Sequence, residues 1–173
     1  ARASAYRALE KHKEALADAH EAVRLLPEDP NNYLLRGNCR VSLSDRNGAL
    51  EDYTKAIELE PGFLGAWYNR AMTYREMKDF YPAIRDLKKC QELAPNEVLF
   101  WVNQGSWYAE MLEFEEAEKV FGHAIGMRPH AYDLYFYRGN VRVQLRKAEE
   151  AIKDYDMALR LEPGLVAGYK MRG

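Results

Sequence analysis

Residues 64–97 read LGAWYNRAMTYREMKDFYPAIRDLKKCQELAPNE, and this stretch decides the fold. Its proline, Pro95, is one of five that recur at a constant spacing of thirty-four positions, at Pro27, Pro61, Pro95, Pro129 and Pro163. A fixed period of this length is the signature of a repeat architecture, in which each repeat is one structural unit stacked on the next. The chain therefore divides into frames of one period each.

Other positions keep the same register. An alanine lies twelve residues before each proline, at Ala15, Ala49, Ala83, Ala117 and Ala151. A second small residue lies five before it, at Ala22, Ala56, Cys90, Ala124 and Ala158. A third lies twenty-four before it, at Ala3, Gly37, Ala71, Gly105 and Gly139. An aromatic residue lies twenty-eight before it, at Tyr33, Trp67, Trp101 and Tyr135.

The second half of each frame has the pattern of an amphipathic helix. Ala49, Tyr53 and Ala56 fall on one helical face, and Ala151 and Tyr155 repeat that face. Small residues at fixed positions allow two helices to approach closely, and the proline ends the second helix because it cannot continue it.

This pattern resembles the tetratricopeptide repeat (TPR) motif, in which an aromatic, a small residue, a tyrosine, alanine, an aromatic, alanine and proline recur with the same period. The third frame reads Trp67, Ala71, Tyr74, Ala83, Leu87, Cys90 and Pro95, and the fourth reads Trp101, Gly105, Tyr108, Ala117, Phe121, Ala124 and Pro129. The resemblance implies an all-α fold, a right-handed superhelix of paired antiparallel helices. We expect one array over 1–173, with a partial repeat at 1–29, full repeats at 30–63, 64–97, 98–131 and 132–165, and the start of a further repeat at 166–173.

The frames depart from the family at the turn between the two helices. The family favours glycine there, whereas this chain has Glu10, Ser44, Lys78, Leu112 and Arg146. We expect these turns to close with unusual or strained geometry, and we expect two helices per repeat in five repeats plus the start of another. Neither end has the polar cap that an array needs for solubility, so we interpret the chain as a segment of a longer solenoid.

An arginine stands where the family usually has leucine, and an aspartate follows it by sixteen residues. The predicted structural ion pairs are Arg2–Asp18, Arg36–Asp52, Arg70–Asp86 and Arg138–Asp154. In the fourth frame both partners change together, to Gln104 and Val120. This joint change favours a bidentate bridge within each repeat over an anion-binding ladder of arginines.

Composition excludes several classes of function. The net charge is −2 and the pI about 6.1, so no basic surface for nucleic acid is predicted. Cys39 and Cys90 lie outside any metal or redox motif, the four histidines have no metal-ligand spacing, and no catalytic motif occurs. No apolar run is long enough to span a membrane. We expect no catalysis, no cofactor and no metal, and a cytoplasmic location.

In TPR proteins the first helices of the repeats line a concave groove, and the resemblance implies a partner site there. The predicted groove residues are Asn38, Tyr68, Asn69, Met72, Val102, Asn103, Phe136, Tyr137 and Asn140. Asparagine is unfavourable inside helices, yet its amide both donates and accepts, which suits the backbone of an extended peptide. The alternative is that asparagine is ordinary at these positions in the family.

One known groove type, the clamp for the acidic tail of a heat-shock chaperone, fits poorly. Asn38 and Asn69 match its asparagines, but Leu34, Leu99 and Asn103 stand where it needs basic residues. The leading interpretation is a non-catalytic scaffold or adaptor that binds a partner peptide or helix. The alternatives are a structural subunit of a permanent multiprotein assembly and a regulatory TPR arm of a larger enzyme.

Overall fold

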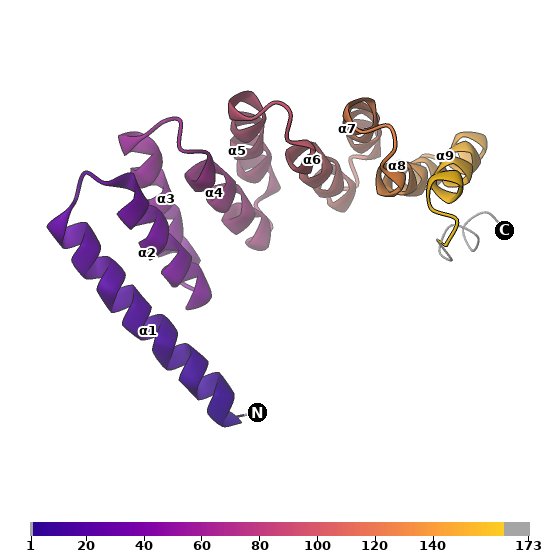
Figure 1. The fold of residues 1–173 in the computed structure, drawn as a ribbon. Helices are drawn as coiled ribbons and strands as arrows, with labels where there is room; N and C mark the ends of the chain where they lie inside the picture. The colour runs from indigo at the N-terminus through magenta and orange to yellow at the C-terminus, as the bar shows by residue number, and fades with distance from the viewer. Residues whose placement is uncertain (1, 165–173) are drawn as a thin grey trace. The chain divides into compact units, whose positions relative to one another are not determined.

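The computed structural model describes the backbone of residues 2–164 and the side chains of residues 10–164, and every regular element in that range is an α-helix (Figure 1). The chain forms two compact units, residues 1–93 and 94–173. The first unit contains α1 (Arg2–Leu25), α2 (Pro30–Ser42), α3 (Arg46–Leu59), α4 (Leu64–Glu76) and α5 (Phe80–Leu93). The second contains α6 (Val98–Glu110), α7 (Phe114–Met127), α8 (Tyr132–Gln144) and α9 (Ala148–Leu161).

Within each unit, every helix packs against the next one along the chain. In addition α2 contacts α4, and α6 contacts α8, so the first helices of successive repeats lie beside each other. The second helix of each pair ends two residues before a proline of the periodic series, as with α3 at Leu59 and α5 at Leu93. The fold is the all-α TPR solenoid that the sequence predicts.

Aspartate side chains cap the starts of α2 and α3. The carboxylate of Asp29 accepts a hydrogen bond from the backbone N–H of Asn31 (2.9 Å), and Pro30 occupies the first helical position of α2. Asp45 caps α3 in the same way through the backbone N–H of Gly48 (3.0 Å). These caps satisfy backbone donors that have no partner inside the helix.

Four of the five predicted turns close with a residue in the left-handed region. The φ angles are 65° at Ser44, 64° at Lys78, 62° at Leu112 and 58° at Arg146. This is the region that glycine favours, and a side chain there costs on the order of 1 kcal/mol. The expected strain at these turns is therefore present.

The prediction of two helices within residues 1–29 was wrong. Residues 2–25 form one continuous helix, α1, that runs through Glu10, so the described residues contain nine helices. The sequence around Glu10 consists of strong helix formers without glycine or proline. A left-handed turn is favourable only where two packed helices compensate for it, and residues 1–9 match only the end of a first helix. The predicted start of a further repeat at 166–173 lies outside the described residues.

The core consists of the small and aromatic residues that keep the periodic register. The alanines Ala49, Ala83 and Ala117 are fully buried, and Ala151 is almost so. In the first unit Tyr33, Ala56, Ile57 and Ala66 form one cluster. In the second, one cluster is centred on Val98 and Leu134 and another on Phe121 and Val141.

Candidate binding site

The structure brings three of the four predicted ion pairs together. Arg36 donates to Asp52 through Nη2 (2.6 Å) and Nε, Arg70 to Asp86 through Nε (2.7 Å) and Nη2 (2.9 Å), and Arg138 to Asp154 through the same two nitrogens. All three aspartates are buried, and each pair joins the two helices of one repeat. The fourth predicted pair, Arg2–Asp18, includes a side chain that lies outside the described ones; the backbone places the two positions about 24 Å apart along the single helix α1.

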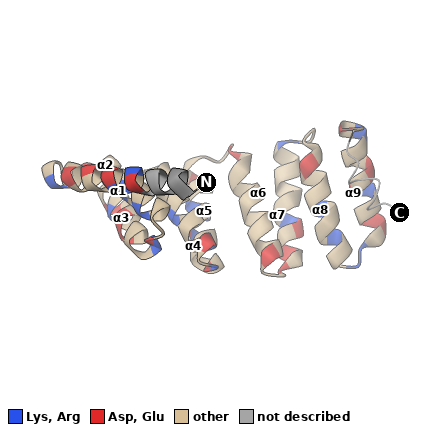
Figure 2. Ribbon diagram, turned by 90° about the horizontal axis from the view of Figure 1, so that it is seen from below, with Lys and Arg blue, Asp and Glu red and all other residues tan. Residues whose placement is uncertain are grey.

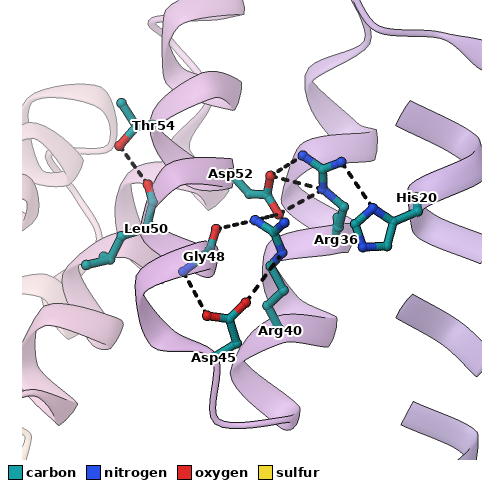
Figure 3. A network of polar contacts seen from close by, with 8 residues as sticks. All are labelled: His20, Arg36, Arg40, Asp45, Gly48, Leu50, Asp52 and Thr54. Atoms are coloured by element: carbon teal, nitrogen blue, oxygen red, sulfur yellow. Dashed lines mark hydrogen bonds and ion pairs between the residues drawn. The ribbon is translucent and has the colours of Figure 1, made fainter. Parts of the chain in front are cut away.

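Two of these pairs include a second arginine that was not among the predicted pairs. Arg40 approaches Asp52 (3.1 Å) and donates to the carbonyl of Gly48 (2.7 Å), so Asp52 lies between two arginines (Figure 3). Arg142 contacts Asp154 (2.8 Å) in the same manner. Both lie four residues after the first arginine, which places them on the same helix face. That spacing was visible in the sequence.

In each repeat that has the ion pair, the aromatic residue of the first helix lies beside the arginine. The guanidinium carbon of Arg36 lies 5.4 Å from the ring centroid of Tyr33, and that of Arg70 lies 4.8 Å from Trp67. In the fourth repeat, which has Gln104, the aromatic Trp101 instead stacks on His123 with 4.0 Å between ring centroids. These interactions are structural.

The first unit has a hollow of about 260 Å³ between α2, α3 and α4, which we call the first hollow. It is lined by Asn38, Val41, Tyr53, Asn69, Met72, Thr73 and Glu76. Three predicted groove residues therefore come together here: Asn38, Asn69 and Met72. Tyr68 is half-buried on α4 but is not part of this lining.

Asn38 is the centre of a hydrogen-bond network in the first hollow. Its side-chain oxygen accepts one bond from the hydroxyl of Tyr53 (2.8 Å) and another from the side-chain nitrogen of Asn69 (2.8 Å). Burial raises the pKa of Tyr53, so its hydroxyl stays protonated and remains the donor. Within the part of the chain that is described, this leaves the nitrogen of Asn38 as a donor and the oxygen of Asn69 as an acceptor for a ligand.

The second unit has a corresponding hollow of about 380 Å³, which we call the second hollow. It is lined by Ser106, Ala109, Glu110, Phe121, Tyr137, Asn140 and Val141. Of the predicted groove residues, Tyr137 and Asn140 lie here. The oxygen of Asn140 accepts a bond from the hydroxyl of Tyr155 (2.9 Å).

The other predicted residues of this unit lie elsewhere. Val102 packs on the core cluster that contains Val98 and Leu134, and Phe136 packs on Tyr155 with 5.9 Å between ring centroids. Asn103 is half-buried on α6. Tyr53 and Phe121 line the hollows although neither was predicted to, because the sequence pattern assigns the second helices to the core alone.

The described residues hold no cluster of histidine, cysteine, aspartate or glutamate that could bind a metal. In the same range, no helix is long and apolar enough to cross a membrane. The side chains that line the two hollows present amide, hydroxyl and apolar groups, which can contact a ligand through hydrogen bonds and apolar surface.

The tetratricopeptide repeat family matches the chain at residues 30–63, 65–97 and 102–165. No curated protein matches the chain in sequence. Among solved structures, MamA from Desulfovibrio magneticus RS-1 is similar with a TM-score of 0.77 and 20% identity, over 95% of this chain and 94% of that one. YrrB, described as a TPR protein with an unusual peptide-binding site, is similar with a TM-score of 0.76 and 19% identity, over 97% of this chain and 87% of that one. At these identities the likeness shows the fold.

Proposed function

The chain belongs to the tetratricopeptide repeat family, and we propose that it is a non-catalytic scaffold or adaptor that binds an extended peptide or a helix of a protein partner. The observation that carries this proposal is the network of Asn38, Tyr53 and Asn69 in the first hollow. The peptide-binding site described for YrrB supports it by analogy of fold.

The network fixes the orientation of both amides before a ligand arrives. Because Tyr53 and Asn69 both donate to the oxygen of Asn38, the nitrogen of Asn38 faces a ligand as a donor and the oxygen of Asn69 as an acceptor. A peptide backbone presents one acceptor and one donor at each residue, so it complements this pair whatever its side chains are. Pre-oriented groups lose less conformational entropy on binding than mobile ones.

The experiment begins with selection of peptides from a displayed library of random short sequences, using the intact chain as bait. Affinities of the selected peptides are then measured by fluorescence anisotropy for the parent chain and two matched variants. Asn69→Ala removes the amide from the first hollow, and Asn47→Ala makes the same change on the outer helix α3, away from both hollows.

We expect Asn69→Ala to weaken binding by about tenfold, roughly 1.4 kcal/mol, because water partly replaces the lost bonds. Asn47→Ala should leave the affinity unchanged. Stability should hardly fall in Asn69→Ala, since Asn38 keeps its bond from Tyr53 and alanine is the better helix former. If a substitution on an outer helix abolishes binding and Asn69→Ala does not, the interpretation of the chain as a structural subunit replaces the proposed function.

A further inference from the structure

The helix α1 lies at the edge of the first unit, and one of its faces is covered by α2 (Figure 1). Ala19 is fully buried, and the backbone carbonyl of Ala22 accepts a hydrogen bond from the side-chain nitrogen of Asn32 (3.2 Å). Nδ1 of His20 lies 3.5 Å from Nη1 of Arg36. On this side α1 is packed against the next repeat, as the second helices of the other repeats are.

Another face of α1 is uncovered. It consists of Ala15, Asp18, Ala22 and Leu25, which a spacing of three and four residues places along one side of the helix. Ala15 and Asp18 are exposed. Ala22 is half-buried, and the side chain of Leu25 is 61% exposed. We call these four residues the open face.

The same four positions are covered in the next repeat. Ala49, Asp52 and Ala56 are buried one period later, because α2 packs on α3. Leu59 is half-buried there. The positions of Ala15 and Ala22 are buried again in every later second helix, at Ala83, Cys90, Ala117, Ala124, Ala151 and Ala158. The open face therefore has the residues of a helix–helix contact, but no helix of the described range covers it.

The carboxylate of Asp18 sets the charge that a covering helix must bring. Its equivalents each accept a hydrogen bond from an arginine of the helix that covers them, at Asp52, Asp86 and Asp154. Among the described side chains Asp18 takes part in no such bond. Acidic and basic residues occur along α1 (Figure 2), but between Ala15 and Leu25 the open face carries only this one charge. An arginine complements it, whereas a second copy of α1 would bring a like charge.

The helices that cover the equivalent faces share a short pattern. An aromatic residue stands three positions before the arginine and a glycine or alanine directly after it, as in Tyr33, Arg36 and Gly37, in Trp67, Arg70 and Ala71, and in Tyr135, Arg138 and Gly139. In all three the aromatic ring lies beside the guanidinium group. The small residue lets the two helices approach closely.

We propose that the open face of α1 binds an amphipathic helix of a protein partner that carries this pattern. The arginine of that helix pairs with Asp18 as Arg70 pairs with Asp86, and its apolar side covers Ala15 and Ala22. No residue of the open face lines either hollow. This second surface is therefore independent of peptide binding in the hollows.

The probe is a synthetic, fluorescein-labelled peptide with the sequence of residues 64–76, LGAWYNRAMTYRE, which contains the pattern. Fluorescence anisotropy measures its affinity for the intact chain and for two variants of the open face. Asp18→Asn removes the charge and keeps the shape of the side chain. Ala15→Leu places a larger side chain where a docked helix would lie, and it should leave the melting temperature unchanged because Ala15 is exposed and both residues are good helix formers.

Each variant has a matched control on the same helix. Glu21→Gln also removes one negative charge from α1, but Glu21 is exposed and paired with Arg24 of its own helix (2.6 Å). Ala17→Leu makes the same enlargement as Ala15→Leu, at an exposed position on another side of α1.

We expect the parent chain to bind the peptide, and Asp18→Asn and Ala15→Leu each to weaken binding by at least about tenfold. The two controls should bind as the parent does. A peptide with glutamine in place of its arginine should bind the parent more weakly. That peptide should also have the same affinity for Asp18→Asn as for the parent, because the ion pair is then absent from both complexes.

Equal affinity of the parent and Asp18→Asn for the unmodified peptide overturns this inference, as does a failure of the peptide to bind. Weaker binding in Asn69→Ala but not in Asp18→Asn overturns it too, because the peptide then occupies the first hollow. Self-association of the parent in sedimentation experiments, if Ala15→Leu abolishes it, assigns the open face to a second copy instead. The first two of these results leave the proposed function of the hollows standing, since that function is tested with other peptides.

Discussion

Gly37 and Tyr53 are in such close contact that a β-carbon on the glycine would lie 2.6 Å from Cε1 of the tyrosine ring. The same relationship holds between Gly139 and Tyr155 (2.6 Å), and between Gly105 and Phe121 (2.9 Å). In the third repeat, where the residue sixteen positions later is Leu87, the small residue is alanine, Ala71. Where the second helix of a repeat has an aromatic ring at this position, the residue sixteen positions earlier in the first helix is therefore glycine.

We predict that Gly37→Ala destabilises the protein by about 1–2 kcal/mol. Overpacking against Tyr53 costs about 1–3 kcal/mol, and the better helix propensity of alanine offsets up to about 1 kcal/mol of it. In a Tyr53→Leu background the same substitution should become neutral or stabilising, because that pair copies Ala71 and Leu87. Urea unfolding of the four proteins measures this change of sign, and equal effects in both backgrounds would show that the ring is not the obstacle.

Much of the fold was predictable because the repeat supplies several examples of each contact within one chain. The register of alanines and prolines predicted the paired helices and their ends, and the joint change to Gln104 and Val120 predicted which arginine faces which aspartate. The continuous helix α1 was not predictable from the period, because the period describes a helix pair, whereas the residues around Glu10 are strong helix formers that favour an unbroken helix.

The candidate site was only partly predictable. Asn38, Asn69, Met72, Tyr137 and Asn140 were expected on the binding surface and do line a hollow. Phe136 and Val102 were expected there too, but they pack on neighbouring side chains, because helix-face position does not specify which neighbour covers a residue. A comparison of positions two periods apart would have indicated the different chemistry of the two hollows.

The turn residues provide a direct test of α1. Leu112→Gly should stabilise the protein by about 0.5–1 kcal/mol, because glycine adopts a φ of 62° without the steric penalty of a leucine side chain. Glu10→Gly, at the corresponding position of the period, should destabilise α1 by about 1 kcal/mol, because there the residue is inside a helix. Circular dichroism melts distinguish the two effects, and stabilisation by Glu10→Gly would mean that residues 1–29 form a helix pair.

The buried thiols should be unreactive while the protein is folded. Burial raises the pKa of the Cys90 thiol to about 12, with a further contribution from the charge of Asp86, and burial also raises the pKa of Cys39. Iodoacetamide at pH 8 should therefore modify Cys90 only as fast as the protein unfolds. Mass spectrometry of native and urea-treated protein measures this, and rapid labelling of Cys90 in native protein would contradict its burial.

Cys90 should also make stability depend on alkaline pH. Its pKa is higher in the folded than in the unfolded state, so the folded state keeps a proton that the unfolded state loses, and stability should fall as pH rises from about 9 towards 12. Cys90→Ala should reduce this slope, and it should fold normally because alanine occupies the equivalent positions Ala56, Ala124 and Ala158. Parallel pH series of the two proteins separate Cys90 from Tyr53, whose pKa is also raised.

Loss of an aspartate from a buried ion pair should be costly in both repeats of the first unit. Asp52→Ala and Asp86→Ala each leave an arginine partly desolvated without its anion, and we expect each to destabilise the protein by on the order of 3 kcal/mol. Chemical unfolding of the single variants gives these values. A loss below about 1 kcal/mol, typical of exposed pairs, would show that the bridge contributes little.

Removing the arginine as well as the aspartate should recover stability to a different extent in the repeat of Asp52 and in the repeat of Asp86. Copying the fourth repeat, Arg70→Gln with Asp86→Val removes both charges, and its glutamine can still bond the hydroxyl of Thr54, which Arg70 contacts now (3.0 Å). Arg36→Gln with Asp52→Val also removes a pair, but it leaves Arg40 without the carboxylate it approaches at 3.1 Å. The third repeat has Tyr74 at the position of Arg40, so no second charge is left there.

We therefore expect the double variant at 70 and 86 to recover most of the lost stability and the one at 36 and 52 to recover clearly less. Adding Arg40→Tyr to the latter should close the gap, and equal recovery without that change would mean that Arg40 does not depend on Asp52.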